Sequence, residues 1–260
     1  MSQIPPLFCA VSPEALPQLR PYPLTPVLLA YQLGPGPRLL RSCPPTLVKG
    51  GLLSVTLGEE DCSGNPDTLC RQAVQECRAR SAIGLLADWD RFSRSLFLLT
   101  RQLGRALSQA GLLLAVPEAY GEVTGTAAVL ISSALSGGSL EVRLKEALER
   151  YGPERVVLAL ERMGEDFVLP SPSGRGTPLS PVGLQSLRQR IRPAVYWSGE
   201  LCARYFTYRS NGQIHFVLFD DGSTLRKKLE LAGQLGVTRA IAAWPEISSC
   251  LGELGISASH

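Results

Sequence analysis

Short apolar runs alternate with amphipathic stretches along the chain, and this alternation is the clearest structural signal in the sequence. Eight runs have the length and composition of strands, and several are almost continuous Val, Leu, Ile and Ala, as in parallel strands buried on both faces. Between them, apolar residues recur every three or four positions over 66–80, 92–110, 139–151 and 223–235, which predicts four helices. The predicted strands are 7–11, 26–34, 50–58, 82–90, 111–119, 127–135, 155–163 and 238–246.

Eight strands with interleaved helices favour a (β/α)8 barrel of the α/β class, formed as a single domain over residues 1–260. A doubly wound sheet is the alternative, since periodicity does not report whether a sheet closes on itself. No G-x-G-x-x-G sequence follows any strand, which disfavours a dinucleotide-binding fold. Two proline- and glycine-rich stretches, 34–46 and 169–181, are predicted to be irregular.

Residues 203–220 interrupt this alternation of strands and helices. Two runs of aromatic and β-branched residues flank Asn211-Gly212, a pair favoured in two-residue turns because both central positions need a positive φ. We therefore predict an antiparallel β-hairpin inserted between the seventh and eighth strands of the barrel.

Composition narrows the classes of function. The chain has 26 Lys and Arg against 23 Asp and Glu, a formal net charge of +3, and we expect no nucleic-acid partner. No apolar run reaches the ~18–20 residues of a membrane span, so no membrane partner is expected. The seven cysteines include no C-x-x-C pair, which predicts reduced thiols. The N-terminal residues lack the features of a secretory signal peptide, so we expect a cytoplasmic protein.

The densest group of polar candidates is Asp88-Trp89-Asp90, at the end of the fourth predicted strand. In a (β/α)8 barrel the active site lies at the carboxyl ends of the strands. Residues i and i+2 share one face of a strand, so Asp88 and Asp90 are expected to point together. A carboxyl group beside another has a raised pKa, as a general acid requires. The alternative is structural: Asp90 caps the following helix, and Asp88 pairs with an arginine.

Further strand ends supply Glu118, Glu161 and Trp244, and the second strand supplies Tyr31. We assign these four as candidate substrate-binding residues. Each glutamate has the alternative of a solvated loop residue, and Trp244 is either a platform for a sugar ring or a half-buried packing residue. The two histidines have no catalytic or metal-binding partner in the sequence, so we expect neither triad chemistry nor a metal or other cofactor.

Several segments resemble the family 18 glycoside hydrolases, in particular the bacterial branch that trims spore-cortex peptidoglycan. Residues 83–90 (IGLLADWD) align with the family signature D-G-x-[DN]-x-D-[FW]-E, and residues 155–170 and 215–229 are similar to two further segments of that branch. Trp244 falls where the family keeps a tryptophan beneath the sugar. The resemblance covers residues 45–247 in shared order and spacing, and it implies a (β/α)8 barrel.

The resemblance also implies a substrate-assisted reaction, in which the N-acetyl carbonyl of the substrate attacks the anomeric carbon. By position, Asp90 would be the general acid and Asp88 the carboxylate that orients the acetamido group. The implied partner is a glycan containing N-acetylglucosamine, either peptidoglycan or chitin-like, with spore-coat or cell-wall proteins as further partners. This leads us to expect association with the mother cell or the spore.

The chain departs from the family pattern where the chemistry lies. Asp90 stands in place of Glu, which withdraws the carboxyl group by one methylene, about 1.5 Å, and a misplacement of ~1 Å costs roughly 100-fold in rate. Ile83 and Leu86 replace polar positions of the signature. Ser133 and Ala134 stand where the family has the Tyr and Asp that hold the N-acetyl group.

Three hypotheses follow. The first is a degenerate family 18 barrel that binds a glycan or another protein without hydrolysing it, which the departures at the acid and the acetamido site favour. The second is a weak or re-specialised glycosidase that uses Asp90 as its acid on peptidoglycan or chito-oligosaccharides. The third is an unrelated (β/α)8 enzyme or scaffold.

Overall fold

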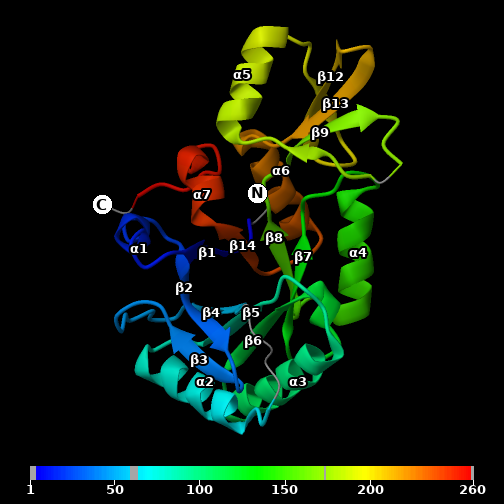
Figure 1. Cartoon of the computed structure of the whole chain (residues 1–260). Helices are drawn as coiled ribbons and strands as arrows, with labels where there is room; N and C mark the ends of the chain where they lie inside the picture. Colours follow the sequence, from blue (N-terminus) through cyan, green and yellow to red (C-terminus); the bar gives the residue numbers. More distant parts are fainter. Residues whose placement is uncertain (1–3, 59–63, 173, 259–260) are drawn as a thin grey trace.

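The computed structural model describes residues 4–58, 64–172 and 174–258. Eight parallel strands close into a barrel, because the first of them pairs with both the second and the last (Figure 1). This confirms the (β/α)8 architecture and excludes the doubly wound alternative. Each barrel strand lies within one of the predicted runs. The strands are β1 (Leu7–Val11), β2 (Thr25–Gly34), β4 (Leu52–Leu57), β5 (Gly84–Asp88), β6 (Leu113–Pro117), β7 (Ala128–Ser132), β8 (Val156–Leu160) and β14 (Ala240–Ala243), with only the first residue of β2 outside its run.

Alternate residues of each strand fill two separate apolar layers, as the pleat of a strand requires. One layer fills the barrel interior, and a larger layer lies between the barrel and its surrounding helices. The interior is packed rather than hollow at this level, so ligand access is confined to the rim. The buried interior residues are Val27, Leu52, Leu86, Ala115, Ala128, Val157, Ala159 and Ile241.

The four predicted helices are present as α2 (Asp67–Ala79), α3 (Arg94–Gln109), α4 (Leu140–Tyr151) and α6 (Gly222–Gln234). Each buries the apolar face that its periodicity predicted, and serine or aspartate side chains cap α3, α4 and α6. Asp221 begins α6 with a capping box that it shares with Thr224.

Other connections of the barrel are shorter than in a regular (β/α)8 fold. Short helices α1 (Leu16–Leu19) and α7 (Trp244–Ile247) follow β1 and β14, η2 (Ser248–Cys250) follows α7, and η1 (Glu118–Tyr120) joins β6 to β7. The prediction of an irregular segment over 34–46 is wrong in part. Residues Arg38–Arg41 form β3, an edge strand that turns back antiparallel to β2.

The chain between β8 and α6 forms a second, antiparallel sheet, which we call the insertion (residues 164–219; Figure 1). The predicted hairpin is confirmed, with a turn at Asn211 (φ 49°) and Gly212 (φ 76°). It is part of a larger sheet, because β9 pairs with β13 and β11 pairs with β12. A further strand, β10, pairs with β9 within the stretch 169–181 that was predicted to be irregular. The insertion consists of β9 (Gly164–Leu169), β10 (Thr177–Pro178), α5 (Pro181–Ile191), β11 (Tyr196–Ser198), β12 (Ala203–Ser210) and β13 (Gln213–Phe219).

Asp220 joins the two ends of the insertion to the barrel. Its backbone N–H donates to the carbonyl of Met163 at 2.8 Å, and its Oδ2 accepts from the Met163 N–H at 2.8 Å. Within the same buried cluster, Lys228 Nζ lies 2.6 Å from Oδ2 and the Thr224 hydroxyl donates to Oδ1 at 2.7 Å. The Asp220 and Lys228 side chains are 0% and 1% exposed, so this pair is isolated from solvent.

The six cysteines in the described ranges are free thiols, and Cys62 lies outside those ranges. Burial raises the pKa of Cys9 and of Cys77 to about 12, so both are protonated and unreactive at neutral pH. Across the described parts of the chain, every helix is too short or too polar to cross a bilayer.

Candidate functional site

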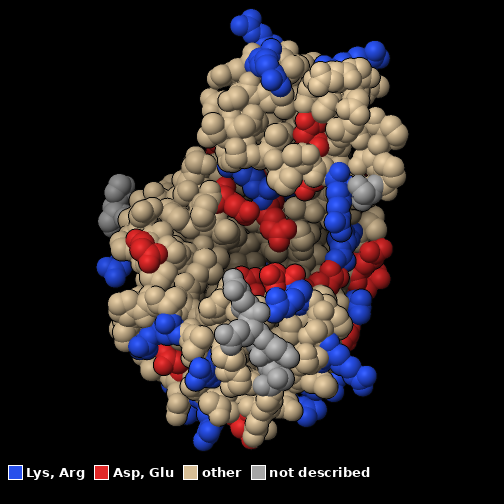
Figure 2. Space-filling model, viewed as in Figure 1, with Lys and Arg blue, Asp and Glu red and all other residues tan. Residues whose placement is uncertain are grey.

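The carboxyl ends of the barrel strands and the insertion enclose a cavity of about 1040 Å³. Figure 2 shows the hollow between the two parts of the molecule, with acidic residues along its borders. A cavity of this size accommodates a ligand of several rings or residues. Its lining comes from the ends of β7, β8 and β14 on the barrel side, and from β9, the β9–β10 connection and α5 on the insertion side.

Asp88 ends β5 and Asp90 follows two residues later, with both side chains exposed. Trp89 between them is buried and donates its indole N–H to Thr100 at 2.8 Å, which fixes this strand end against α3. The structural alternative for this pair is wrong. Ser93 caps α3, and within the described ranges neither aspartate forms an ion pair with an arginine.

The pKa of Asp88 is raised. The first cause is desolvation by the surrounding strand ends, and the second is the negative charge of Asp90. The two carboxyl groups therefore lie close enough to interact, as their spacing on the strand predicted. An uncompensated carboxyl group with a raised pKa is able to hold a proton closer to neutral pH than an ordinary aspartate.

Glu161 lies just beyond β8 and lines the cavity. Its Oε2 accepts a hydrogen bond from the Ser132 hydroxyl at 2.5 Å, which joins the ends of β7 and β8. Ser133, at one of the family's acetamido positions, is fully buried, and its hydroxyl contacts only the backbone of Glu161 among the described residues. Ser133 is therefore not available to a ligand.

Glu118 begins η1 after β6, and its carboxylate forms an ion pair with Arg143 of α4. The pairing neutralises the carboxylate and ties η1 to the outside of the barrel. Glu118 is absent from the lining of the cavity in the described residues. The structure thus brings Glu161 to the cavity and keeps Glu118 apart from it.

Tyr31 and Trp244 do not face the mouth of the barrel. Tyr31 is 5% exposed in the layer between barrel and helices, and its hydroxyl donates to Glu76 of α2 at 2.6 Å. Trp244 is 8% exposed, and its indole N–H donates to Gln18 at 3.2 Å. Both rings are packed and hydrogen-bonded within the protein, and for Trp244 this favours the packing alternative.

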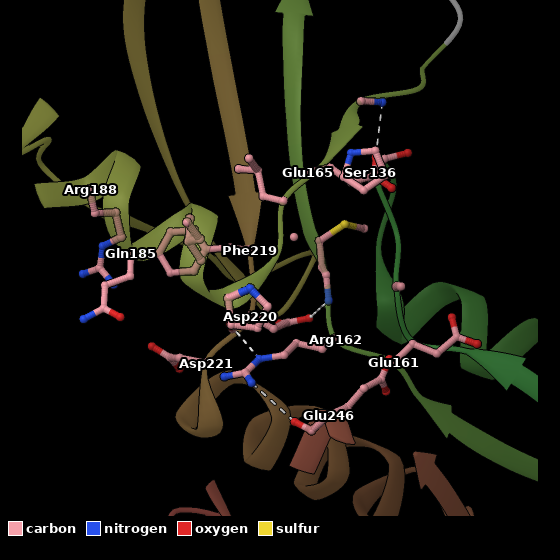
Figure 3. Close-up of a pocket in the computed structure, with 18 of the residues that line it drawn as sticks. Ser136, Glu161, Arg162, Glu165, Gln185, Arg188, Phe219, Asp220, Asp221 and Glu246 are labelled. Carbon is pink, nitrogen blue, oxygen red and sulfur yellow. Dashed lines mark hydrogen bonds between the residues drawn. The ribbon is translucent and has the colours of Figure 1, made fainter. Parts of the chain in front are cut away.

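Seven charged residues of the cavity were not predicted from the sequence. They are Arg162, Glu165, Arg175, Arg188, Asp220, Asp221 and Glu246, and Figure 3 labels all of them except Arg175. Arg162 donates to the backbone carbonyls of Asp220 at 3.5 Å and Glu246 at 3.4 Å. Burial and the charge of Glu161 raise the pKa of Glu246. Arg162 and Glu246 adjoin predicted strand ends, so their positions near the barrel mouth were predictable. Glu165 and Arg188 reach the cavity only because the insertion folds over the mouth, which no local pattern indicates.

Metal binding has no support from clustering of ligands in the described part of the chain. No three His, Cys, Asp or Glu side chains gather there closely enough to hold an ion. The site consists instead of charged groups with hydrogen-bonding capacity around an open cavity.

No sequence profile of a known family and no curated protein matches the chain. Solved structures do match its fold. The spore cortex-lytic enzyme SleL of Bacillus megaterium QM B1551 is 16% identical with a TM-score of 0.63, over 94% of this chain and 71% of that one. A chitinase from Chromobacterium violaceum is 15% identical with a TM-score of 0.69, over 96% and 98%. A mutant class V chitinase from Nicotiana tobaccum in complex with NAG4 is 12% identical with a TM-score of 0.62, over 97% and 99%.

Proposed function

We propose that this protein, which has the chitinase-like family 18 fold, binds a glycan containing N-acetylglucosamine at the barrel mouth and does not hydrolyse it efficiently. The observation that carries the proposal is that the two positions where the family binds the acetamido group offer no polar side chain to a ligand. Ser133 is buried and Ala134 has no polar side chain, so neither position offers a group to the N-acetyl carbonyl. A substrate-assisted reaction needs that carbonyl to be held against the anomeric carbon.

The short side chain of Asp90, the candidate general acid, supports the same proposal. Asp90 is one methylene shorter than the family's glutamate. Trp244 is hydrogen-bonded to Gln18 of α1 and is absent from the described lining of the cavity. A glycan ligand is supported by the neighbours in fold, of which one was solved in complex with NAG4 and two are named spore cortex-lytic enzymes. We extend the proposal to peptidoglycan as the ligand and to association with the spore or cell wall.

The test combines binding with digestion. We expect titration calorimetry to detect binding of chitotetraose or a soluble peptidoglycan fragment, and mass spectrometry to detect no released product after prolonged incubation with either. An active chitinase run in parallel controls for the quality of the substrate. Absence of binding to every glycan tested, by a protein shown to be folded from its circular dichroism, would refute the proposal.

One observation favours a second function, a weak glycosidase. Asp88 and Asp90 have no cationic partner among the described residues, and the raised pKa of Asp88 suits a group that exchanges protons. In this case Asp90→Glu restores the reach of the acid and is expected to increase hydrolysis of chito-oligosaccharides by about tenfold or more, given the cost of a ~1 Å misplacement. Asp88→Ala and Asp90→Ala would abolish it. If the wild type and the three variants all release product only at the background rate, the weak-glycosidase function is refuted and the binding function is retained.

A further inference from the structure

Besides Arg175, Asp220 and Asp221, five charged side chains line the cavity. Arg162 and Arg188 are cationic, and Glu161, Glu165 and Glu246 are anionic (Figure 3). Although they surround one space, none of the five takes part in an ion pair in the described parts of the chain. The other acids that line the cavity differ in this respect, because Asp220 is paired with Lys228 and Asp221 with Arg204.

Four of these groups contact neutral partners, whereas the Glu246 carboxyl interacts with the charges of Glu161 and Arg162. Arg162 donates to two backbone carbonyls, and Arg188 lies over the ring of Phe219, with its guanidinium carbon 5.3 Å from the centroid. Glu161 accepts from a hydroxyl and Glu165 from the Gly176 backbone N–H at 3.2 Å. These four charges are thus held in position and retain hydrogen-bonding capacity toward the cavity.

A neutral oligosaccharide such as chitin leaves this set of charges unmatched. Covering an ion without pairing it costs free energy, whereas a ligand group of opposite charge recovers that cost through charge-assisted hydrogen bonds. A group that carries both a carboxylate and an ammonium matches both signs at once. Amino-acid and short-peptide branches have this chemistry.

We infer that the cavity between β8, β14 and α5 binds the zwitterionic amino-acid or peptide branch of a glycan, with Arg162 and Arg188 receiving its carboxylate and Glu161 and Glu246 its ammonium group. The inference rests on the proposed glycan-binding function and specifies its ligand: a glycan with peptide branches rather than an unbranched neutral one. In this arrangement the sugar lies toward Asp88 and Asp90, which are absent from the described lining of the cavity, and the cavity between the ends of β8 and β14 and α5 receives the branch.

The test compares two ligands that differ only in the branch: a disaccharide of N-acetylglucosamine and N-acetylmuramic acid, and the same disaccharide carrying a tetrapeptide. We expect calorimetry to give a dissociation constant about tenfold lower for the peptide-bearing form, the order of one charge-assisted hydrogen bond. Arg188→Met and Glu246→Gln are each expected to reduce this preference, and so is high salt. Arg209→Met, an exposed arginine of β12 outside the cavity, is the matched control and should preserve it.

The outcomes separate the two proposals. Equal affinity for both disaccharides overturns the branch site and leaves glycan binding intact. A preference that survives in both Arg188→Met and Glu246→Gln shows that the branch binds elsewhere and also overturns the inference. No binding of either disaccharide refutes the proposed function itself. Thermal melts of each variant establish that it is folded, so that a lost preference reports on the cavity.

Discussion

Asp88 ends β5, Asp90 follows two residues later, and the pKa of Asp88 is raised. Desolvation is the larger cause of the raised pKa of Asp88, and the neighbouring charge of Asp90 is the smaller. No cation within the described ranges pairs with either carboxylate. The two carboxylates repel each other at neutral pH, so other contacts must hold this strand end in place. The hydrogen bond from Trp89 to Thr100 is one such contact.

The raised pKa of Asp88 predicts the sign of its effect on stability. The folded state binds this proton more tightly than the unfolded state, so stability falls as the pH rises from the ordinary aspartate pKa through the raised one. Asp88→Asn should therefore increase the free energy of unfolding at pH 7, by a few tenths to about 1 kcal/mol for a group this exposed. The gain should vanish below the ordinary pKa. Urea titrations at several pH values measure it, and a gain that grows toward low pH would contradict desolvation and charge repulsion as its cause.

Tyr31 shows why single site residues are hard to place from sequence. Val27 faces the barrel interior, so simple alternation would also turn Leu29 and Tyr31 inward. The pairing of β2 with β4 shifts register between Leu29 and Tyr31, and this irregularity reverses the faces of the following residues. No residue type marks the position of the bulge, whereas the spacing of Asp88 and Asp90 on an unbroken strand was predictable.

Elements were more predictable than residues because their signals are repeated over many positions. Each barrel strand and long helix repeats its hydrophobic pattern through its length, and the hairpin has a turn pair with specific backbone requirements. The missed strands β3, β9, β10 and β11 have four, six, two and three residues, and β3 and β10 lie among prolines and glycines. Strands this short are formed by the sheet edges they pair with, rather than by their own sequence.

The turn of the hairpin provides a direct test at this scale. Gly212 has a φ of +76°, and no atom lies within 4 Å of the position that an alanine methyl group would take, so Gly212→Ala introduces backbone strain and no clash. We expect it to destabilise the protein by about 1–2 kcal/mol. Gly137→Ala is the matched control, because that site is equally open and lacks a positive φ. Equal urea midpoints for the two variants would argue against the turn conformation.

At the scale of the whole molecule, the barrel and the insertion meet at a buried ionic cluster. Asp220 contacts Met163 in the connection between β8 and β9, and it contacts α6 through Thr224 and Lys228. The cavity is bounded on one side by residues whose position depends on this junction, including Glu161 and Arg162 just before Met163. The relative placement of the two parts therefore depends on a few polar contacts as well as on apolar packing.

Removal of one partner of this cluster should be costly. Lys228→Met leaves the Asp220 carboxylate buried without its cation, and we expect a loss of about 3–5 kcal/mol in the free energy of unfolding. Lys49→Met makes the same change at an exposed lysine and should alter stability by less than about 0.5 kcal/mol. Urea denaturation at pH 7 measures both. Similar midpoints for the two variants would show that the buried pair contributes little.

The reciprocal hydrogen bonds between Met163 and Asp220 have a further consequence for how such a barrel can diversify. They join the two ends of the insertion where it leaves and re-enters the barrel, so residues 164–219 form a closed loop on the barrel. Each doubling of loop length costs only about 0.6 kcal/mol in closure entropy. The insertion, which forms one wall of the cavity, can therefore change in length and charge while the eight barrel strands keep the same register.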